Sequence, residues 1–95
     1  MAAKLTGKVV SVNDHGDLVT DIPVSDLLLA PTDESITIRC DGHATTCLFP
    51  AEHGQPEMTF IALQGRSGFL ELSLVGESAT KFLGIHPGAD VSVRW

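Results

Sequence analysis

Hydrophobic and polar residues alternate with a period of two through much of the chain, which is typical of strands with one buried face. In the clearest case, Leu70, Leu72 and Leu74 alternate with Phe69, Glu71 and Ser73. A glycine-rich turn precedes this segment at residues 64–68. We therefore predict a strand from residue 69 to residue 74 whose leucines face the core.

One short helix is predicted after this strand. Residues 76–78, Gly-Glu-Ser, interrupt the alternation, and Ala79, Phe82 and Leu83 then recur at the spacing of one helical face. The helix is expected near residues 78–83. Because so short a helix is marginal alone, we expect Phe82 and Leu83 to pack onto the sheet and hold it there.

The ends of this helix carry capping residues. Ser78 is the expected N-cap, and Gly84 stands where a left-handed C-cap is favoured. A single helical turn is also predicted at residues 25–29, with Ser25 as its cap. A short strand is nearly as well supported for that segment.

Six further segments have strand patterns, separated by Gly, Pro, Asn and Asp residues that favour turns. They are residues 7–12, 18–22, 36–40, 44–49, 58–63 and 90–95. Short strands at this spacing are typical of a small barrel or sandwich. The sequence thus predicts a single all-β domain over residues 1–95, a small antiparallel barrel of about seven strands with one short helix.

Composition and charge narrow the classes of function. The net charge is −6, from 12 acidic and 6 basic residues, and there is no basic stripe to neutralise phosphates, so we expect no nucleic-acid partner. No run of about 18 apolar residues occurs, so no membrane span is expected. The first seven residues lack the apolar segment of a signal peptide, which makes the cytoplasm the expected location.

Two cysteines raise the question of a metal site. Cys40, His43 and Cys47 form a C-x2-H-x3-C pattern that superficially suggests zinc. Asp41-Gly42 is a hairpin signal, however, that would pair Cys40 with His43 and carry Cys47 several residues away. Because closed zinc sites need four converging ligands, we expect no metal here.

Two separated segments resemble the signatures of a known family. Residues 7–22 read GKVVSVNDHGDLVTDI and resemble a signature of the form G-x-V-V-x-V-D-x-F-G-N-L-x-T-N-I. Residues 65–84 resemble a second signature, S-x-G-x-L-E-I-A followed by S-A-A-x-x-L-G. Both are similar to the C-terminal β-barrel domain of the S-adenosyl-L-methionine (SAM) hydroxide adenosyltransferases, which include the related fluorinases and chlorinases.

The resemblance implies a cofactor site shared between domains. In such enzymes the cofactor lies between the N-terminal domain of one subunit and the C-terminal barrel of the next, within a trimer. The groups that activate water or halide belong mostly to the N-terminal domain. The resemblance therefore implies that this chain is not an enzyme by itself and holds at most half a site.

Six residues correspond by resemblance to ligand-binding positions of the family. They are Asn13, Asp17, Phe49, Arg66, Ser67 and Gly76. Asn13 falls where the family has Asp, and Asp17 falls on its adenine-binding Asn. An ionised Asp can only accept hydrogen bonds, whereas the amide of Asn both donates and accepts.

The other positions keep more of the family's chemistry. Phe49 falls on an aromatic that packs on adenine, although a core position suits it at least as well. Arg66 and Ser67 have the residue types, in reversed order, that hold the methionine carboxylate in fluorinases; the alternative is an exposed turn. Gly76 falls where a backbone group meets the adenine edge.

Three functional hypotheses remain open. The first is a non-catalytic binding or assembly module, derived from the cofactor-binding half of an adenosyltransferase. The second is the C-terminal piece of a split enzyme, completed by a separately encoded N-terminal partner. The third is a binder of a small anionic or nucleoside ligand. No cofactor is certain, but SAM or adenosine is possible by resemblance, as is a homo-oligomer.

Overall fold

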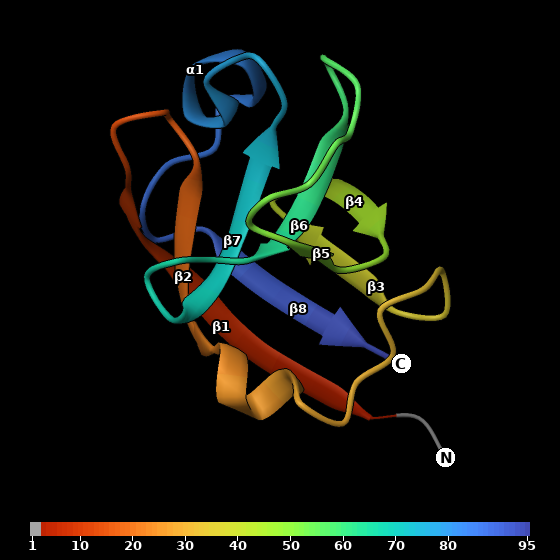
Figure 1. The fold of residues 1–95 in the computed structure, drawn as a ribbon. Coiled ribbons are helices and arrows are strands. Elements are labelled where there is room, and N and C mark those ends of the chain that lie inside the picture. The colour runs from red at the N-terminus through yellow and green to blue at the C-terminus, as the bar shows by residue number, and fades with distance from the viewer. Residues whose placement is uncertain (1–2) are drawn as a thin grey trace.

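The computed structural model describes residues 3–95, which form one curled eight-stranded sheet (Figure 1). Residues 1 and 2 of the predicted domain lie outside the described residues. The strands are β1 (Lys4–Val12), β2 (Leu18–Pro23), β3 (Thr37–Cys40), β4 (His43–Thr46), β5 (Phe49–Pro50), β6 (Phe60–Gln64), β7 (Phe69–Leu74) and β8 (Asp90–Arg94). The helices are η1, a 3-10 turn at Val24–Leu27, and α1 (Ala79–Leu83). The prediction of an all-β domain with one short α-helix is confirmed.

Strand order in the sheet is β4-β3-β8-β1-β2-β7-β6-β5. The register between β1 and β2 shifts after Val9, and Gly7 in β1 lets the side chains of Asp21 and Ile22 occupy the space that a Cβ would need. The sheet therefore curls about β1 into a half-barrel. Its two ends approach each other where the Thr45 hydroxyl donates to the carbonyl of Phe60 at 2.8 Å.

The core lies inside this curl and is built from side chains that the strands direct inward. All three leucines of the alternating segment are buried there, as the sequence predicts. They pack with residues of the first two strands and the last one, among them Val9, Leu18, Val91 and Val93. Trp95 is half-buried against the same cluster.

Strand prediction fails at residues 44–49. The Asp41-Gly42 hairpin pairs Cys40 with His43 as expected. The strand then ends at Thr46, because Cys47 adopts a left-handed conformation with φ of 71° and turns the chain away. Phe49 instead pairs in parallel with Leu63 of β6, so the barrel is not wholly antiparallel.

Two helix predictions need correction. Ser25 does not cap the turn at 24–27, since Pro23 holds the N-cap position with no side-chain hydrogen bond. Ser78 and Gly84 do cap α1 as predicted: the Ser78 side chain accepts from the amide of Lys81, and Gly84 has a φ of 70°. The packing of α1 was predicted for Phe82 and Leu83, and it holds for one of them: Leu83 is partly buried against the core, whereas Phe82 is 60% exposed and Ala79 is the fully buried contact.

Candidate functional site

The outer face of β7 is the floor of the candidate site. Glu71 and Ser73 alternate with the core leucines, yet they are only 7% and 6% exposed. On the neighbouring strand, Ile61 and Leu63 are also buried, and none of these four side chains belongs to the core cluster. This second face of the sheet is therefore largely shielded from solvent, although its side chains lie outside the core cluster.

Two adjoining pockets open over this floor. The first, which we call the Arg66 pocket, has a volume of about 560 Å³ and takes its walls from the turn between β1 and β2, the loop after β5 and the turn before β7. It is lined by Asn13, His15, Asp17, Val19, Ala51, Leu63, Arg66, Ser67 and Glu71. Four of the six sequence-predicted residues therefore meet at one place, although they come from opposite halves of the chain.

The second pocket, which we call the Gly76 pocket, has a volume of about 430 Å³. Its lining combines the end of β7 with the start of the α1 cap, namely His15, Asp17, His53, Ser73, Leu74, Val75, Gly76, Glu77 and Ser78. His15 and Asp17 line both pockets. The two hollows together form one elongated site with Asp17 at the junction.

The turn that carries Asp17 is organised by Asn13. The side-chain oxygen of Asn13 accepts from the backbone amides of His15 and Asp17, at 2.9 and 3.0 Å, and its amide nitrogen donates to the Asp17 carboxylate at 3.3 Å. This Asx-type arrangement fixes the turn conformation. The hydrogen bonds of Asn13 are thus used to position Asp17, which presents its carboxylate to the site.

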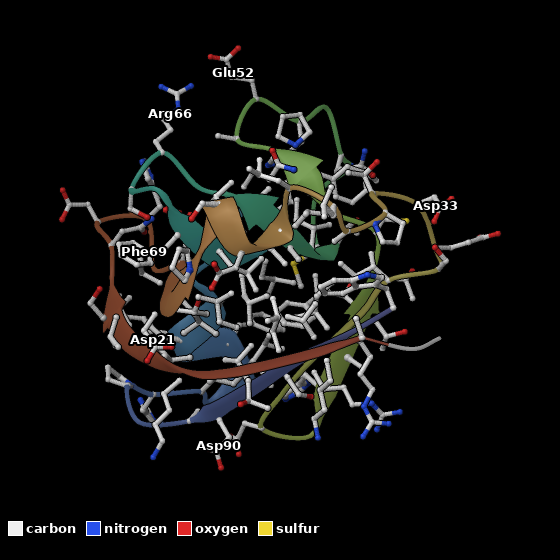
Figure 2. The ribbon with its side chains drawn as sticks, turned by 90° about the horizontal axis from the view of Figure 1, so that it is seen from below. Asp21, Asp33, Glu52, Arg66, Phe69 and Asp90 are labelled. Carbon is white, nitrogen blue, oxygen red and sulfur yellow. The ribbon has the colours of Figure 1, made fainter. Side chains whose placement is uncertain are left out.

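Arg66 lies at the rim and points outward. Its guanidinium donates to the carboxylate of Glu52 at 2.9 Å, and both side chains are largely exposed (Figure 2). An exposed ion pair of this kind contributes little to stability and can be replaced by a ligand. Arg66 links the turn before β7 to the loop after β5 across the mouth of its pocket.

Ser67 makes a different hydrogen bond from the one that the resemblance implies. Its hydroxyl donates to Glu71 at 2.7 Å, so its proton is directed to a carboxylate of the protein. Glu71 was missed as a site residue because its alternating pattern predicts an ordinary solvent-facing strand position. Its place in the second signature was the one available signal.

Phe49 is not part of the lining of either pocket, although its strand partner Leu63 lines the Arg66 pocket. It is half-buried in β5, where it pairs with Leu63, and it lines neither hollow. Gly76 has a φ of 81°, and a Cβ there would lie 3.2 Å from the side chain of Glu57. Its backbone is thus brought to the pocket wall at a position that favours glycine.

The cysteine pattern forms no metal centre among residues 3–95, where no group of three or more His, Cys, Asp or Glu residues has suitable geometry. Cys40 is buried, and burial followed by the charges of Asp41 and Asp90 raises the pKa of its thiol to about 11. Cys47 is a half-buried free thiol. No helix among the described residues is long and apolar enough to cross a membrane.

The fold and the two-part pocket define a small half-barrel domain with a polar surface site. Residues 7–92 match the sequence model of the SAM hydroxide adenosyltransferase C-terminal domain. Since the match covers nearly the whole chain, the chain belongs to this family. The resemblance seen in the two signatures is confirmed at the level of the family.

Solved structures share the fold. An uncharacterized conserved protein from Thermotoga maritima superposes with a TM-score of 0.72 at 22% identity, over 93% of this chain and 34% of that one. A conserved hypothetical protein from Thermus thermophilus gives a TM-score of 0.68 at 21% identity, with the same coverage. This chain thus spans about a third of the length of those proteins. No curated protein matches it.

Proposed function

We propose that this domain is a non-catalytic binding module that holds an adenosyl ligand, SAM or adenosine, in the elongated site formed by the two pockets. The observation that carries the proposal is the convergence of Asn13, Asp17, Arg66 and Ser67 on one pocket, beside the pocket of Gly76. Family membership supplies the chemical class of the ligand.

The shape of the site supports an elongated ligand. A nucleoside with a substituent on its sugar has two polar ends, and the two pockets provide two polar regions joined at Asp17. Asp17 can accept from an exocyclic amino group such as that of adenine. It cannot donate to the ring nitrogen beside that group, so weak binding of adenosine, in the high micromolar to millimolar range, is expected.

Calorimetric titration with adenosine and with SAM tests this proposal. Asp17→Asn supplies the missing donor and is expected to tighten adenosine binding by about two- to tenfold, since one hydrogen bond within a pocket is worth roughly 0.5–1.5 kcal/mol. Asp26→Asn is the matched control, because it removes the same charge from the exposed turn at 24–27. Absence of heat with either ligand at millimolar concentration, in the wild type and in Asp17→Asn, would sink the proposal.

The proposal also states that the domain alone does not convert SAM. Incubation of the purified chain with SAM is expected to yield no adenosine above the level of a buffer blank, measured by chromatography. Formation of adenosine that Arg66→Ala abolishes would contradict a non-catalytic role.

The cytoplasmic location stays a prediction.

A second function is favoured by the coverage of the solved structures. Because the fold occurs there as a third of a longer chain, the domain can serve as the C-terminal part of a split adenosyltransferase. Leu28 and Leu29, 77% and 94% exposed, offer an apolar contact for an N-terminal domain or for other copies of the chain. Sedimentation of the chain alone and mixed with a separately encoded N-terminal domain distinguishes a monomer, a homo-oligomer and a complex.

A further inference from the structure

Glu71 occupies the centre of the site floor. It lies on β7, between Val19 of β2 and Leu63 of β6, so strands flank it on both sides. The side chain is more than nine-tenths buried and still lines the Arg66 pocket. A carboxylate in this position is rare in a strand unless it has a partner, because burying an uncompensated charge is costly.

Local structure is built around this carboxylate. A Cβ at residue 65 would clash with Oε2 of Glu71, so a glycine is needed there for the carboxylate to fit. Ser67 donates its hydroxyl to the same oxygen. Every fully enclosed side-chain oxygen and nitrogen in residues 3–95 has a hydrogen-bond partner, and Oε1 has none, so Oε1 must be open to the pocket.

No cation of the protein compensates Glu71 within the part of the chain that the structure describes. The ion pairs there join Lys8 to Asp90 and Arg66 to Glu52. Asp17 adds a second carboxylate to the same pocket. The carboxylates of Glu71 and Asp17 thus line the Arg66 pocket together with the exposed side chain of His15, which has no ion pair with either of them, while the guanidinium of Arg66 is paired with Glu52 at the rim.

We propose that Glu71 is the specificity-determining residue of the Arg66 pocket and selects a ligand whose end carries a positive charge, such as an ammonium group. The inference rests on the proposed nucleoside function. It differs from recognition of a carboxylate by Arg66 and Ser67, because the Ser67 hydroxyl donates its hydrogen bond to Glu71. A bound ammonium would donate a hydrogen bond to Oε1 and neutralise the negative charge of Glu71.

A matched pair of nucleosides tests the charge preference. Adenosine and 5′-amino-5′-deoxyadenosine differ in a hydroxyl and an ammonium at the same carbon. Calorimetry is expected to show the amine binding at least about tenfold more tightly to the wild type, because a hydrogen bond to a charged group is worth more than a neutral one. In Glu71→Gln, which keeps the shape and removes the charge, the preference is expected to fall below about threefold.

Glu34→Gln is the control, since it removes the same charge from an exposed loop and should keep the full preference. Equal binding of the two nucleosides to the wild type would overturn the inference and leave the proposed function standing. Binding of neither would overturn both. If Glu71→Gln does not fold, the wild-type pair alone still decides the charge preference. If a folded Glu71→Gln variant keeps the full preference for the amine over adenosine, another group causes that preference, and the role of Glu71 is overturned.

Discussion

At the scale of single residues, the contact between Gly65 and Glu71 shows how the site is built. The carboxylate of Glu71 occupies the space that any side chain at residue 65 would need. Gly65 also closes the turn before β7, where its carbonyl accepts from the amide of Gly68 and its own amide donates to the carbonyl of Phe69. One glycine thus serves both the turn and the buried acid.

Gly65→Ala is expected to lower the free energy of unfolding by about 1–3 kcal/mol, the usual cost of forcing an extra methyl into a packed site. Chemical denaturation of the variant measures it. Gly54→Ala is the control, because a Cβ there meets nothing within 4 Å. Equal effects of the two substitutions would show that the close approach at residue 65 has no energetic consequence.

Cys40 provides a prediction about pH. Its pKa is raised from 9.0 to about 11 in the folded chain, first by burial and then by Asp41 and Asp90. Between these values the unfolded chain has lost the thiol proton and the folded chain keeps it, so the stability falls as the pH rises from about 9 to about 11. Denaturation at several pH values in this range should show a smaller loss for Cys40→Ala. The same loss in both proteins would rule out this role for the thiol.

Residue-level prediction from the sequence succeeded for the core and failed for the floor of the site. The leucines of β7 were assigned correctly, because apolar burial leaves a period-2 signal. Glu71 and Ser73 gave the same signal as solvent-facing residues. Burial there depends on tertiary contacts, such as those of Glu71 with Gly65 and Ser67, which the alternation does not indicate.

At the scale of elements, α1 is held by its caps and by the turn between β1 and β2. The carbonyl of Gly16 accepts from the amide of Thr80 at 3.2 Å, and a Cβ at residue 16 would clash with the Ser78 hydroxyl. The sequence predicted both caps, since capping chemistry is local. It was right about Leu83 and wrong about Phe82 as packing residues, because a five-residue helix has too few residues to define its buried side.

Ser78→Ala is expected to lower the free energy of unfolding by about 1 kcal/mol, the typical cost of losing an N-cap. Thermal unfolding followed by circular dichroism measures the change. Ser25→Ala should have almost no effect, because Ser25 does not cap the turn at 24–27 in the described structure. If Ser25→Ala destabilises the protein as much as Ser78→Ala does, Ser25 acts as the cap that the sequence predicted.

The same contrast between local and distant causes explains the strand between residues 44 and 49. Three strand-compatible residues, Cys47, Leu48 and Phe49, follow Thr46, and nothing in the sequence marks Cys47 as left-handed. The break places Phe49 beside β6, where it lines neither pocket. Its candidate site role came from the family resemblance alone, which does not indicate where the strand ends.

At the scale of the whole molecule, the antiparallel pairing of β2 with β7 allows residues from the turn at 13–17 and from the turn before β7 to line one pocket. A third hollow of about 500 Å³ lies elsewhere, lined by residues from β1, β8 and the end of β3. Asp21 and Asp90 lie on that side, opposite Arg66 and Glu52 (Figure 2). This third hollow can therefore serve as the control region in experiments that locate a bound ligand.

The most direct test of the account is an amide chemical-shift titration of the isotope-labelled domain with SAM. The account predicts saturable shifts at residues 13, 15, 17, 66, 67, 71 and 73–78, which line the two joined pockets. Residues 6–8, 39–41 and 90–92 around the other hollow should stay unchanged. Shifts confined to that hollow, or none up to millimolar SAM, would contradict the assignment of the adenosyl site.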